Sequence, residues 1–195
     1  MNSLKLDRRA VKSRNAIHTA FAELLLERGF NSLTLNAVAD RANVGRSTLY
    51  EHFHGKHDLL SPSLTAPLDV LASVVDAAAE KAAMMSLLAH VRQHQRIART
   101  LLSWPLRRVV SNVLSGLVCA RLKHTIKTSA EQVSPLIAVN AIAAHIAESQ
   151  LAILEQWLFG CAECDAETLA TAMRSSAQAV VTVLMFRRSW PPTLA

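Results

Sequence analysis

Residues 33–60 limit the fold of this chain more than any other stretch. Thr34 is a residue type that often precedes a helix, because its hydroxyl can accept a hydrogen bond from a free N–H of the first turn. The apolar residues after it recur at the spacing of one helical face: Leu35, Val38, Ala39 and Ala42. Asn43 follows, and asparagine tolerates the positive φ of a tight turn better than most residues. The stretch therefore predicts a short helix and then a sharp turn.

A second short helix is expected directly after this turn. Gly45 can cap its N-terminus, and Leu49 and Phe53 stand four residues apart, so both can face inward. The side chains left to point outward are those of Arg46, Ser47, Thr48, Tyr50 and His52. A further helix begins near Lys56. A short helix with these hydrogen-bond donors on its outer side has the size and chemistry to enter the major groove of DNA.

Residues 14–60 resemble the DNA-binding domain of the TetR family of bacterial transcriptional regulators. The resemblance rests on separated elements that agree in type and spacing: E-R-G-F at 27–30, L-T at 33–34, V-A at 38–39, R-S-T-L-Y-E-H-F at 46–53, then Lys56, Leu59 and Leu60. Two positions depart from the family pattern. Asn43 stands where Gly is usual, and Gly45 stands where Ser is usual. Both are chemically compatible, since glycine caps a helix only slightly less well than serine.

The resemblance implies a set of side chains that contact DNA: Thr34, Asn36, Arg46, Ser47, Thr48, Tyr50, His52 and Lys56. Physical chemistry agrees, because Arg and Asn can read guanine and adenine with paired hydrogen bonds, while Lys and hydroxyl groups can hold phosphates. Glu51 opposes this role, because a carboxylate beside phosphates is repelled unless it meets a cytosine amino group. The alternative for the whole set is an ordinary solvated helix surface.

Composition agrees with a helical fold and an anionic partner. The 195 residues include few Gly (5) and Pro (6), and the net charge is +6 with a pI of about 9.7. Residues 1–60 carry nine Lys or Arg against six Asp or Glu, and the remainder carries twelve against nine. The basic excess is therefore denser in the first part of the chain, where the helix-turn-helix lies.

The first helix is expected from about Leu6 or Arg9 to Arg28, with Gly29 as its end. Residues 1–13 form a basic lead, which is either a solvated end or an arm that adds phosphate contacts. We expect two domains: residues 1–60 bind DNA, and residues 61–195 bind an effector and dimerise.

Helical periodicity continues through residues 68–81, 83–102 and 106–127, and Pro62 and Pro67 are expected at a kink and at a helix start. Two further helices are expected: 135–159, with Ser134 and Pro135 at its start, and 165–187, capped by Asp165. The first of these is apolar on much of its circumference, so it needs burial on two sides. Their order and apolarity resemble the dimerisation helices of the TetR family, so a homodimer is expected.

Other residues of chemical interest have ordinary alternatives. His90 and His94 stand four residues apart, but no third metal ligand lies near them in sequence, so a core or pocket histidine is favoured over a metal site. His94 and Trp104 are candidates for contacts with a small-molecule effector. Cys161 and Cys164 form a C-x-x-C without a second pair, which favours an incidental pair in a loop over a redox or metal site.

The sequence thus predicts an all-α regulator: an N-terminal three-helix helix-turn-helix domain followed by a larger helical dimerisation and ligand-binding domain. Its expected partners are a palindromic double-stranded DNA operator, a small-molecule effector and a second copy, and by resemblance it is more often a repressor than an activator. No catalytic motif, cofactor motif, signal peptide or membrane span is apparent, so we expect a cytoplasmic protein that is not an enzyme. The alternatives are a small-molecule sensor or partner-binding protein with a residual DNA-binding domain and, less favoured, an enzyme with an accessory one.

Overall fold

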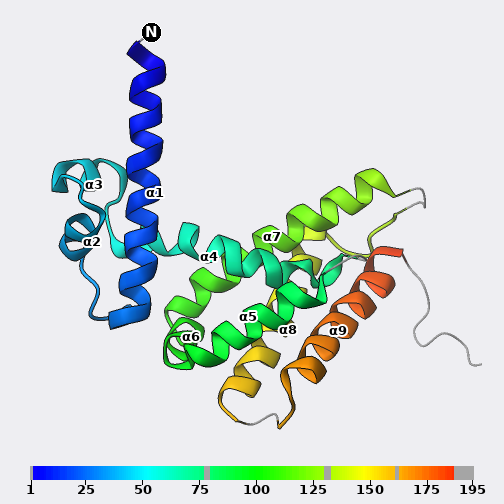
Figure 1. Ribbon diagram of the computed structural model, residues 1–195. Coiled ribbons are helices and arrows are strands. Elements are labelled where there is room, and N and C mark those ends of the chain that lie inside the picture. The colour runs from blue at the N-terminus through cyan, green and yellow to red at the C-terminus, as the bar shows by residue number, and fades with distance from the viewer. Residues whose placement is uncertain (1, 77–79, 130–132, 161–162, 187–195) are drawn as a thin grey trace, which may run out of the picture. The chain divides into compact units, whose positions relative to one another are not determined.

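The computed structural model describes residues 2–76, 80–129, 133–160 and 163–186 (Figure 1). Every regular element among these residues is a helix, which confirms the all-α prediction. The chain divides into two compact units, Met1–Leu64 and Thr65–Ala195.

The first unit contains α1 (Asn2–Arg28), α2 (Leu35–Ala42), α3 (Arg46–His52) and the beginning of α4 (Lys56–Ala72). Its core is formed by side chains from all four helices, including Ile17, Phe21, Leu24, Val38, Leu49, Leu59 and Leu60, each at most 1% exposed. The expected start of the first helix, at Leu6 or Arg9, is too late. Since no Pro or Gly occurs before Gly29, nothing in the local sequence prevents an earlier start.

Helix ends in this unit follow the local predictions. Gly29 has a φ of 76°, and its N–H donates to the carbonyl of Leu25 at 3.0 Å, as expected for a glycine that ends a helix. The hydroxyl of Thr34 accepts a hydrogen bond from the N–H of Ala37 at 3.2 Å, so Thr34 is the N-cap of α2.

Pro62 and Pro67 both lie within α4, so the expected helix start at Pro67 is wrong. A proline inside a helix removes one backbone hydrogen bond and normally costs stability. Here the helix also buries five leucines, Leu59, Leu60, Leu64, Leu68 and Leu71. Their burial offsets the lost backbone bonds.

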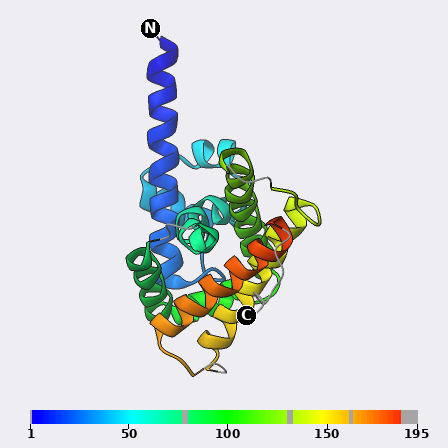
Figure 2. The same ribbon diagram turned by 90° about the vertical axis from the view of Figure 1, so that its right-hand side faces the viewer.

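The second unit contains η1 (Ser73–Val75), α5 (Lys81–Gln93), α6 (Gln95–Leu102), α7 (Leu106–Thr128), α8 (Val139–Leu158) and α9 (Ala166–Phe186), besides the end of α4. α8 packs between α7 and α9 (Figures 1 and 2). The contact face of α7 repeats every four residues: Leu106, Val110, Leu114, Val118 and Leu122 are all buried. The helix expected over 83–102 is broken at His94, whose backbone (φ −107°, ψ 33°) separates α5 from α6.

α8 begins at Val139, so the expected start at Ser134 and Pro135 is wrong. Instead, the N–H groups of Ser134 and Leu136 donate to the carbonyls of Met185 and Leu184, at 3.2 and 2.8 Å. The last carbonyls of a helix have no partner within the helix. The segment before α8 therefore supplies donors to the C-terminal end of α9, and this interaction holds it outside the helix. The other expected cap is confirmed, because Asp165 Oδ1 accepts from the N–H of Thr168 at 2.7 Å.

Two arginines of α7 join this helix to its neighbours. Arg107 pairs with Glu155 and, at 3.0 Å, with Glu148 of α8. Arg121 pairs with Asp76 and, at 2.7 Å, with Asp69 near the end of α4. Both arginine side chains are only 25% exposed, so these pairs are screened by solvent less than ordinary surface pairs.

Two helical stretches are long and apolar enough to cross a membrane by length and composition alone: Lys56–Val75 and Ala166–Phe186. The core helix of a soluble protein passes the same test, so one or two such helices are weak evidence for a membrane. In α9, only 22% of the apolar window is buried within the chain. Most of the remaining residues of α9 are half-buried within the chain, and a few are exposed.

Candidate nucleic-acid interface

α3 is anchored through its inner side. Leu49 is fully buried, and Phe53, directly after the helix, is 7% exposed. The ring of His18 from α1 meets the ring of Phe53 edge to face, with 5.4 Å between centroids. Burial and the nearby charge of Arg14 lower the pKa of His18, which favours the neutral ring. These contacts hold α3 against α1 by its apolar side.

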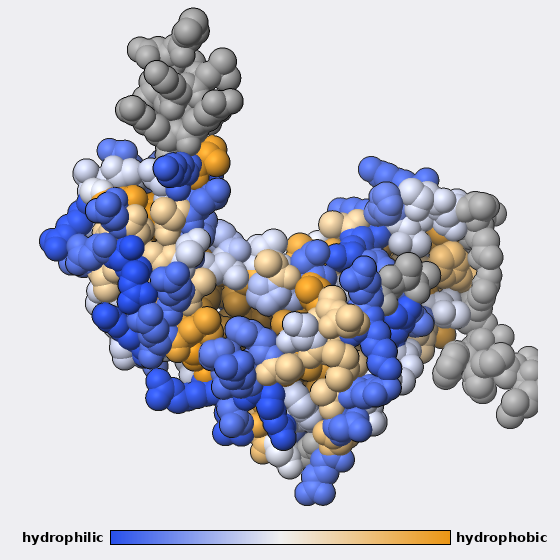
Figure 3. All heavy atoms as spheres, viewed as in Figure 1, coloured by the Kyte–Doolittle hydropathy of each residue, from blue (hydrophilic) through white to orange (hydrophobic). Residues whose placement is uncertain are grey.

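The outer side of α3 carries the predicted side chains. Arg46, Ser47 and Tyr50 are exposed, while Thr48 and His52 are half-buried. Hydrophilic residues predominate on the visible surface of the first unit (Figure 3). Glu51 is exposed on the same helix, so the outer side of α3 is not purely basic.

The turn between α2 and α3 uses Asn43 as predicted. Its φ of 51° and ψ of 48° lie in the left-handed region. The N–H of Val44 donates to the carbonyl of Ala39 at 3.1 Å, which closes the C-terminal end of α2. Gly45 caps α3 through its backbone alone, and its carbonyl accepts from the N–H of Leu49 at 3.1 Å.

The start of α2 lies at the surface as well. Thr34 and Asn36 are both exposed. The hydroxyl oxygen of Thr34 already accepts the capping bond from Ala37, but its O–H remains able to donate. The first unit thus exposes polar side chains at the start of α2 and along α3.

The resemblance implies that Lys56 contacts DNA, whereas in this structure its ammonium lies beside backbone carbonyls of the α1–α2 loop. Its Nζ lies 2.9 Å from the carbonyl oxygen of Phe30, 3.2 Å from that of Asn31 and 3.5 Å from that of Leu33. It also lies 4.6 Å from the centroid of the Phe30 ring. The ammonium has three N–H donors, and the carbonyls of the α1–α2 loop can occupy all of them. In this structure Lys56 holds that loop.

Arg41 is a residue that sequence reasoning missed. Its guanidinium makes two parallel hydrogen bonds of 2.8 Å to Glu27 and one of 3.2 Å to Glu23, and so ties α2 to α1. The hydrogen bond from Arg41 lowers the pKa of Glu27. The two acids lie four residues apart on α1, which is the only sequence signal for this contact.

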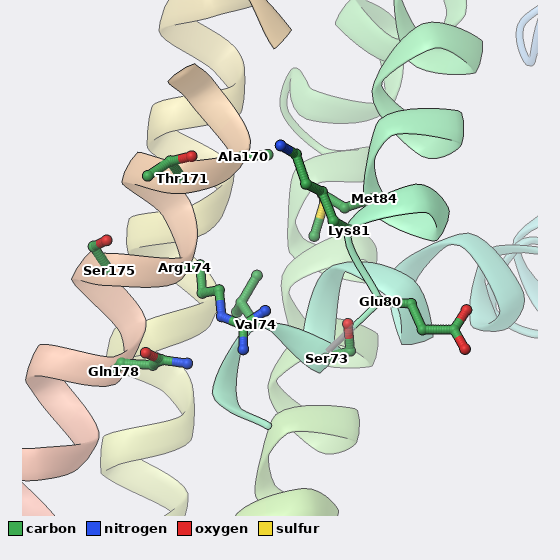
Figure 4. A pocket seen from close by; sticks show the side chains of 10 residues that line it. All are labelled: Ser73, Val74, Glu80, Lys81, Met84, Ala170, Thr171, Arg174, Ser175 and Gln178. Carbon is green, nitrogen blue, oxygen red and sulfur yellow. The ribbon is translucent and has the colours of Figure 1, made fainter. Parts of the chain in front are cut away.

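The second unit contains a pocket (Figure 4), and the candidate effector residues are not among the residues that line it. That pocket lies between η1, α5 and α9, and neither His94 nor Trp104 lines it. Trp104 is 86% exposed, so the structure gives it no position inside the unit. His94 ends α5, and its ring lies 4.6 Å from that of His90. Burial, with the nearby His94, lowers the pKa of His90.

The cysteine pair is only partly described. Cys161 lies outside the described residues, and Cys164 is a half-buried free thiol. The carbonyl of Cys164 accepts a hydrogen bond of 3.0 Å from the indole of Trp157. Within the described residues, no group of three or more His, Cys, Asp or Glu side chains could hold a metal ion.

Comparison with protein families finds a sequence match within this first unit. Residues 17–61 match the family model described as bacterial regulatory proteins, tetR family. The uncharacterized HTH-type transcriptional regulator YxbF of Bacillus subtilis (strain 168) is 33% identical over 57 residues, which are 29% of this chain and 15% of that protein. This chain therefore matches only a small part of the relative's length.

Solved structures share the fold over nearly the whole chain. A TetR transcriptional regulator from Streptococcus agalactiae 2603V is 24% identical with a TM-score of 0.51, covering 90% of this chain and 98% of that one. FadR of Thermus thermophilus, a TetR-family transcriptional repressor in complex with lauroyl-CoA, is 18% identical with a TM-score of 0.51, covering 92% and 98%. At these identities the likeness shows the fold alone.

Proposed function

Since this chain belongs to the TetR family of bacterial regulatory proteins, we propose that it is a homodimeric transcriptional repressor that leaves a palindromic operator when a small molecule binds. In this proposal residues 1–60 bind DNA, and residues 61–195 dimerise and bind the effector. The observation that carries it is α3: a short helix anchored by Leu49 and Phe53, with Arg46, Ser47 and Tyr50 exposed on its other side.

The exposed side chains divide by chemistry into two groups. Arg46 and Asn36 can make paired hydrogen bonds to a base edge, so we assign them to guanine and adenine contacts. Hydroxyl groups can donate to phosphates, which carry no sequence information, and we assign this role to Thr34, Ser47, Thr48 and Tyr50, with His52 beside them. Lys56 supports this surface by holding the α1–α2 loop, because its donors already have carbonyl partners.

The proposed dimer uses α8 and α9. Val180, Val181, Val183 and Leu184 on α9 are only half-buried within one chain. A soluble protein rarely leaves such a continuous apolar stretch exposed. A second copy, packed by a two-fold axis, would cover the same stretch on both chains. This arrangement is consistent with a cytoplasmic regulator.

The proposed effector is a small molecule bound in the second unit. The repressor FadR of similar fold has been solved with lauroyl-CoA, and the second unit of this chain contains a pocket of about 290 Å³. Such a ligand can release DNA only if it binds the DNA-free conformation more tightly than the DNA-bound one.

A second candidate is a small-molecule sensor whose DNA-binding domain is residual. The exposed carboxylate of Glu51 on α3 favours it, because this charge opposes phosphate binding. The two candidates differ in their affinity for specific DNA.

The test begins by selecting bound sequences from random duplex DNA. Affinity for the selected duplex and for a scrambled one is then measured by fluorescence anisotropy over a salt series. We expect Arg46→Ala and Asn36→Ala each to cost roughly 1–3 kcal/mol per base contact on the selected duplex and to relax preference at one position in each half-site. Lys123→Ala, which removes an exposed cation of the second unit, is the matched control.

Equal losses on both duplexes would show that Arg46 and Asn36 do not read bases. Failure to enrich any sequence, with only weak salt-dependent binding, would favour the sensor over the regulator.

A further inference from the structure

Two histidine side chains meet at the junction of α5 and α6 (Figure 1). His90 lies in the last turn of α5, and His94 is the residue at which α5 ends and α6 begins. The N–H of His94 donates to the carbonyl of His90 at 3.0 Å, so the two residues are one helical turn apart. Their ring centroids lie 4.6 Å apart. The two imidazoles therefore lie side by side.

The histidine pair lies at the surface of the second unit. His90 is exposed and His94 is half-buried, so the expected role of a core histidine does not hold for His90. Solvent reaches both side chains. A solute ion can therefore approach the pair without any opening of the fold.

The separation and tilt of the two rings suit one shared metal ion. Zn²⁺ binds an imidazole nitrogen at about 2.0–2.1 Å, and an ion held in this way by two imidazoles brings their ring centres to roughly 4.5–5 Å. The observed separation is 4.6 Å. An imidazole nitrogen donates its lone pair in the plane of the ring, so a shared ion must lie where the two planes meet. The planes here are inclined at 50°, whereas parallel stacked rings would have no such meeting point.

The basic residues near the pair have other partners. The guanidinium of Arg92 lies 4.8 Å from the centre of the Trp157 ring. Arg99 donates to the carbonyl of Leu158 at 3.1 Å and lies over the ring of Phe159. Both cations therefore interact with the end of α8, although their charge lowers the affinity of the pair for any cation.

The ligand set selects the class of ion. Within the described residues, no third His, Cys, Asp or Glu joins His90 and His94 in a metal-binding group. Imidazole nitrogen suits Zn²⁺, Cu²⁺ and Ni²⁺, whereas Mg²⁺ and Ca²⁺ require oxygen ligands. Two neutral nitrogens without a carboxylate therefore favour a transition metal.

We propose that His90 and His94 together bind one divalent transition-metal ion, Cu²⁺, Ni²⁺ or Zn²⁺, through one nitrogen of each ring, with water completing the coordination. The second imidazole binds an ion that the first already holds, so the two ligands act together. The bound ion joins the last turn of α5 to the start of α6 and stabilises this junction. Metal binding here does not require DNA binding.

Metal binding is measured by calorimetry and thermal unfolding of the full chain with CuCl₂, NiCl₂, ZnCl₂ and MgCl₂. We expect one site per chain, with Cu²⁺ bound more tightly than Ni²⁺ or Zn²⁺ and no binding of Mg²⁺. Transition metal at ten times its Kd should raise the Tm by roughly 3–6 °C. Absence of saturable binding by all three transition metals would overturn the proposal.

Variants then locate the bound ion. His90→Gln and His94→Gln are each expected to weaken binding roughly 10-fold or more, because one imidazole remains. His124→Gln, which removes an exposed histidine of α7, is the matched control and should leave affinity unchanged. The double variant His94→Gln/Gln95→His keeps the number of histidines but moves one by a single position, and it should bind as weakly as His94→Gln. Full affinity in this double variant would show that the two rings do not share an ion.

Two further measurements exclude other ligands. Cys161 and Cys164 form a second possible ligand pair, so the titrations are repeated in Cys161→Ser/Cys164→Ser, where the affinity should persist. Electron paramagnetic resonance of the Cu²⁺ form, without any substitution, should show two nitrogen ligands. Loss of binding in the serine variant, a spectrum without nitrogen ligands, or binding that survives in both His90→Gln and His94→Gln would place the ion elsewhere and overturn the assignment.

Discussion

Replacing Lys56 by methionine removes the ammonium and keeps most of the aliphatic side chain. The hydrogen bond of 2.9 Å to Phe30 is part-buried, whereas the bond of 3.2 Å to Asn31 is exposed, and the 3.5 Å contact with Leu33 is at the limit of hydrogen-bond distance. A hydrogen bond from a charged donor contributes about 1.5–3 kcal/mol, and the ammonium over the Phe30 ring adds about 0.5–1 kcal/mol.

Water replaces the ammonium at the exposed carbonyl, so the contributions do not add in full. We expect Lys56→Met to lower the free energy of unfolding of the first unit by about 2–3 kcal/mol. Lys12→Met, which removes an exposed cation of α1, is the matched control and should change it by less than about 0.5 kcal/mol.

The assay uses the only tyrosine of the chain, Tyr50, which lies in the first unit. Incorporation of 3-fluorotyrosine gives one ¹⁹F resonance, and its change during urea titration reports unfolding of this unit alone. Far-UV circular dichroism follows the rest of the chain.

DNA binding distinguishes the two roles of Lys56. If it supports the loop, the salt dependence of DNA binding should be the same in wild type and Lys56→Met once both are folded. If it contacts phosphate instead, the slope of log affinity against log salt should fall by about 0.9 per lost contact, with little change in stability. That second pattern would refute the role inferred from the carbonyl contacts.

Further predictions concern other parts of the chain. Val183→Glu should convert a dimer to folded monomers in sedimentation experiments, because it places a charge in the proposed interface. Ala82→Glu, outside that interface, should leave the dimer intact. A dimer that persists in Val183→Glu would contradict the proposed interface. The hydrogen bond from Ser111 lowers the pKa of Glu148, so the ionised carboxylate stabilises the fold at neutral pH. This stabilisation is lost as pH falls through the lowered pKa. The difference in free energy of unfolding between wild type and Glu148→Gln should therefore close over the same pH range in urea titrations. Asn43→Ala should destabilise the first unit by about 1–2 kcal/mol because of its positive φ, whereas Asn43→Gly should be close to neutral; equal losses would show that φ is not the cause.

Local chemistry in the sequence was enough to predict the all-α fold and the helix ends of the first unit. Thr34 caps α2, Asn43 makes the left-handed turn, and Gly29 ends α1. Each of these outcomes depends on one residue and its neighbours within about four positions, so the pattern is visible without the fold. The exposed side of α3 follows in the same way from the inward spacing of Leu49 and Phe53.

Only the tertiary structure decided which groups meet across long separations in the chain. The carbonyls that surround the ammonium of Lys56 belong to residues more than twenty positions away. α8 begins later than predicted because the N–H groups of Ser134 and Leu136 donate to carbonyls at the end of α9. α4 continues through its prolines because its leucines are buried. Hydrogen bonding and burial depend on which partners the fold brings within reach, and that information is not local to any stretch of sequence.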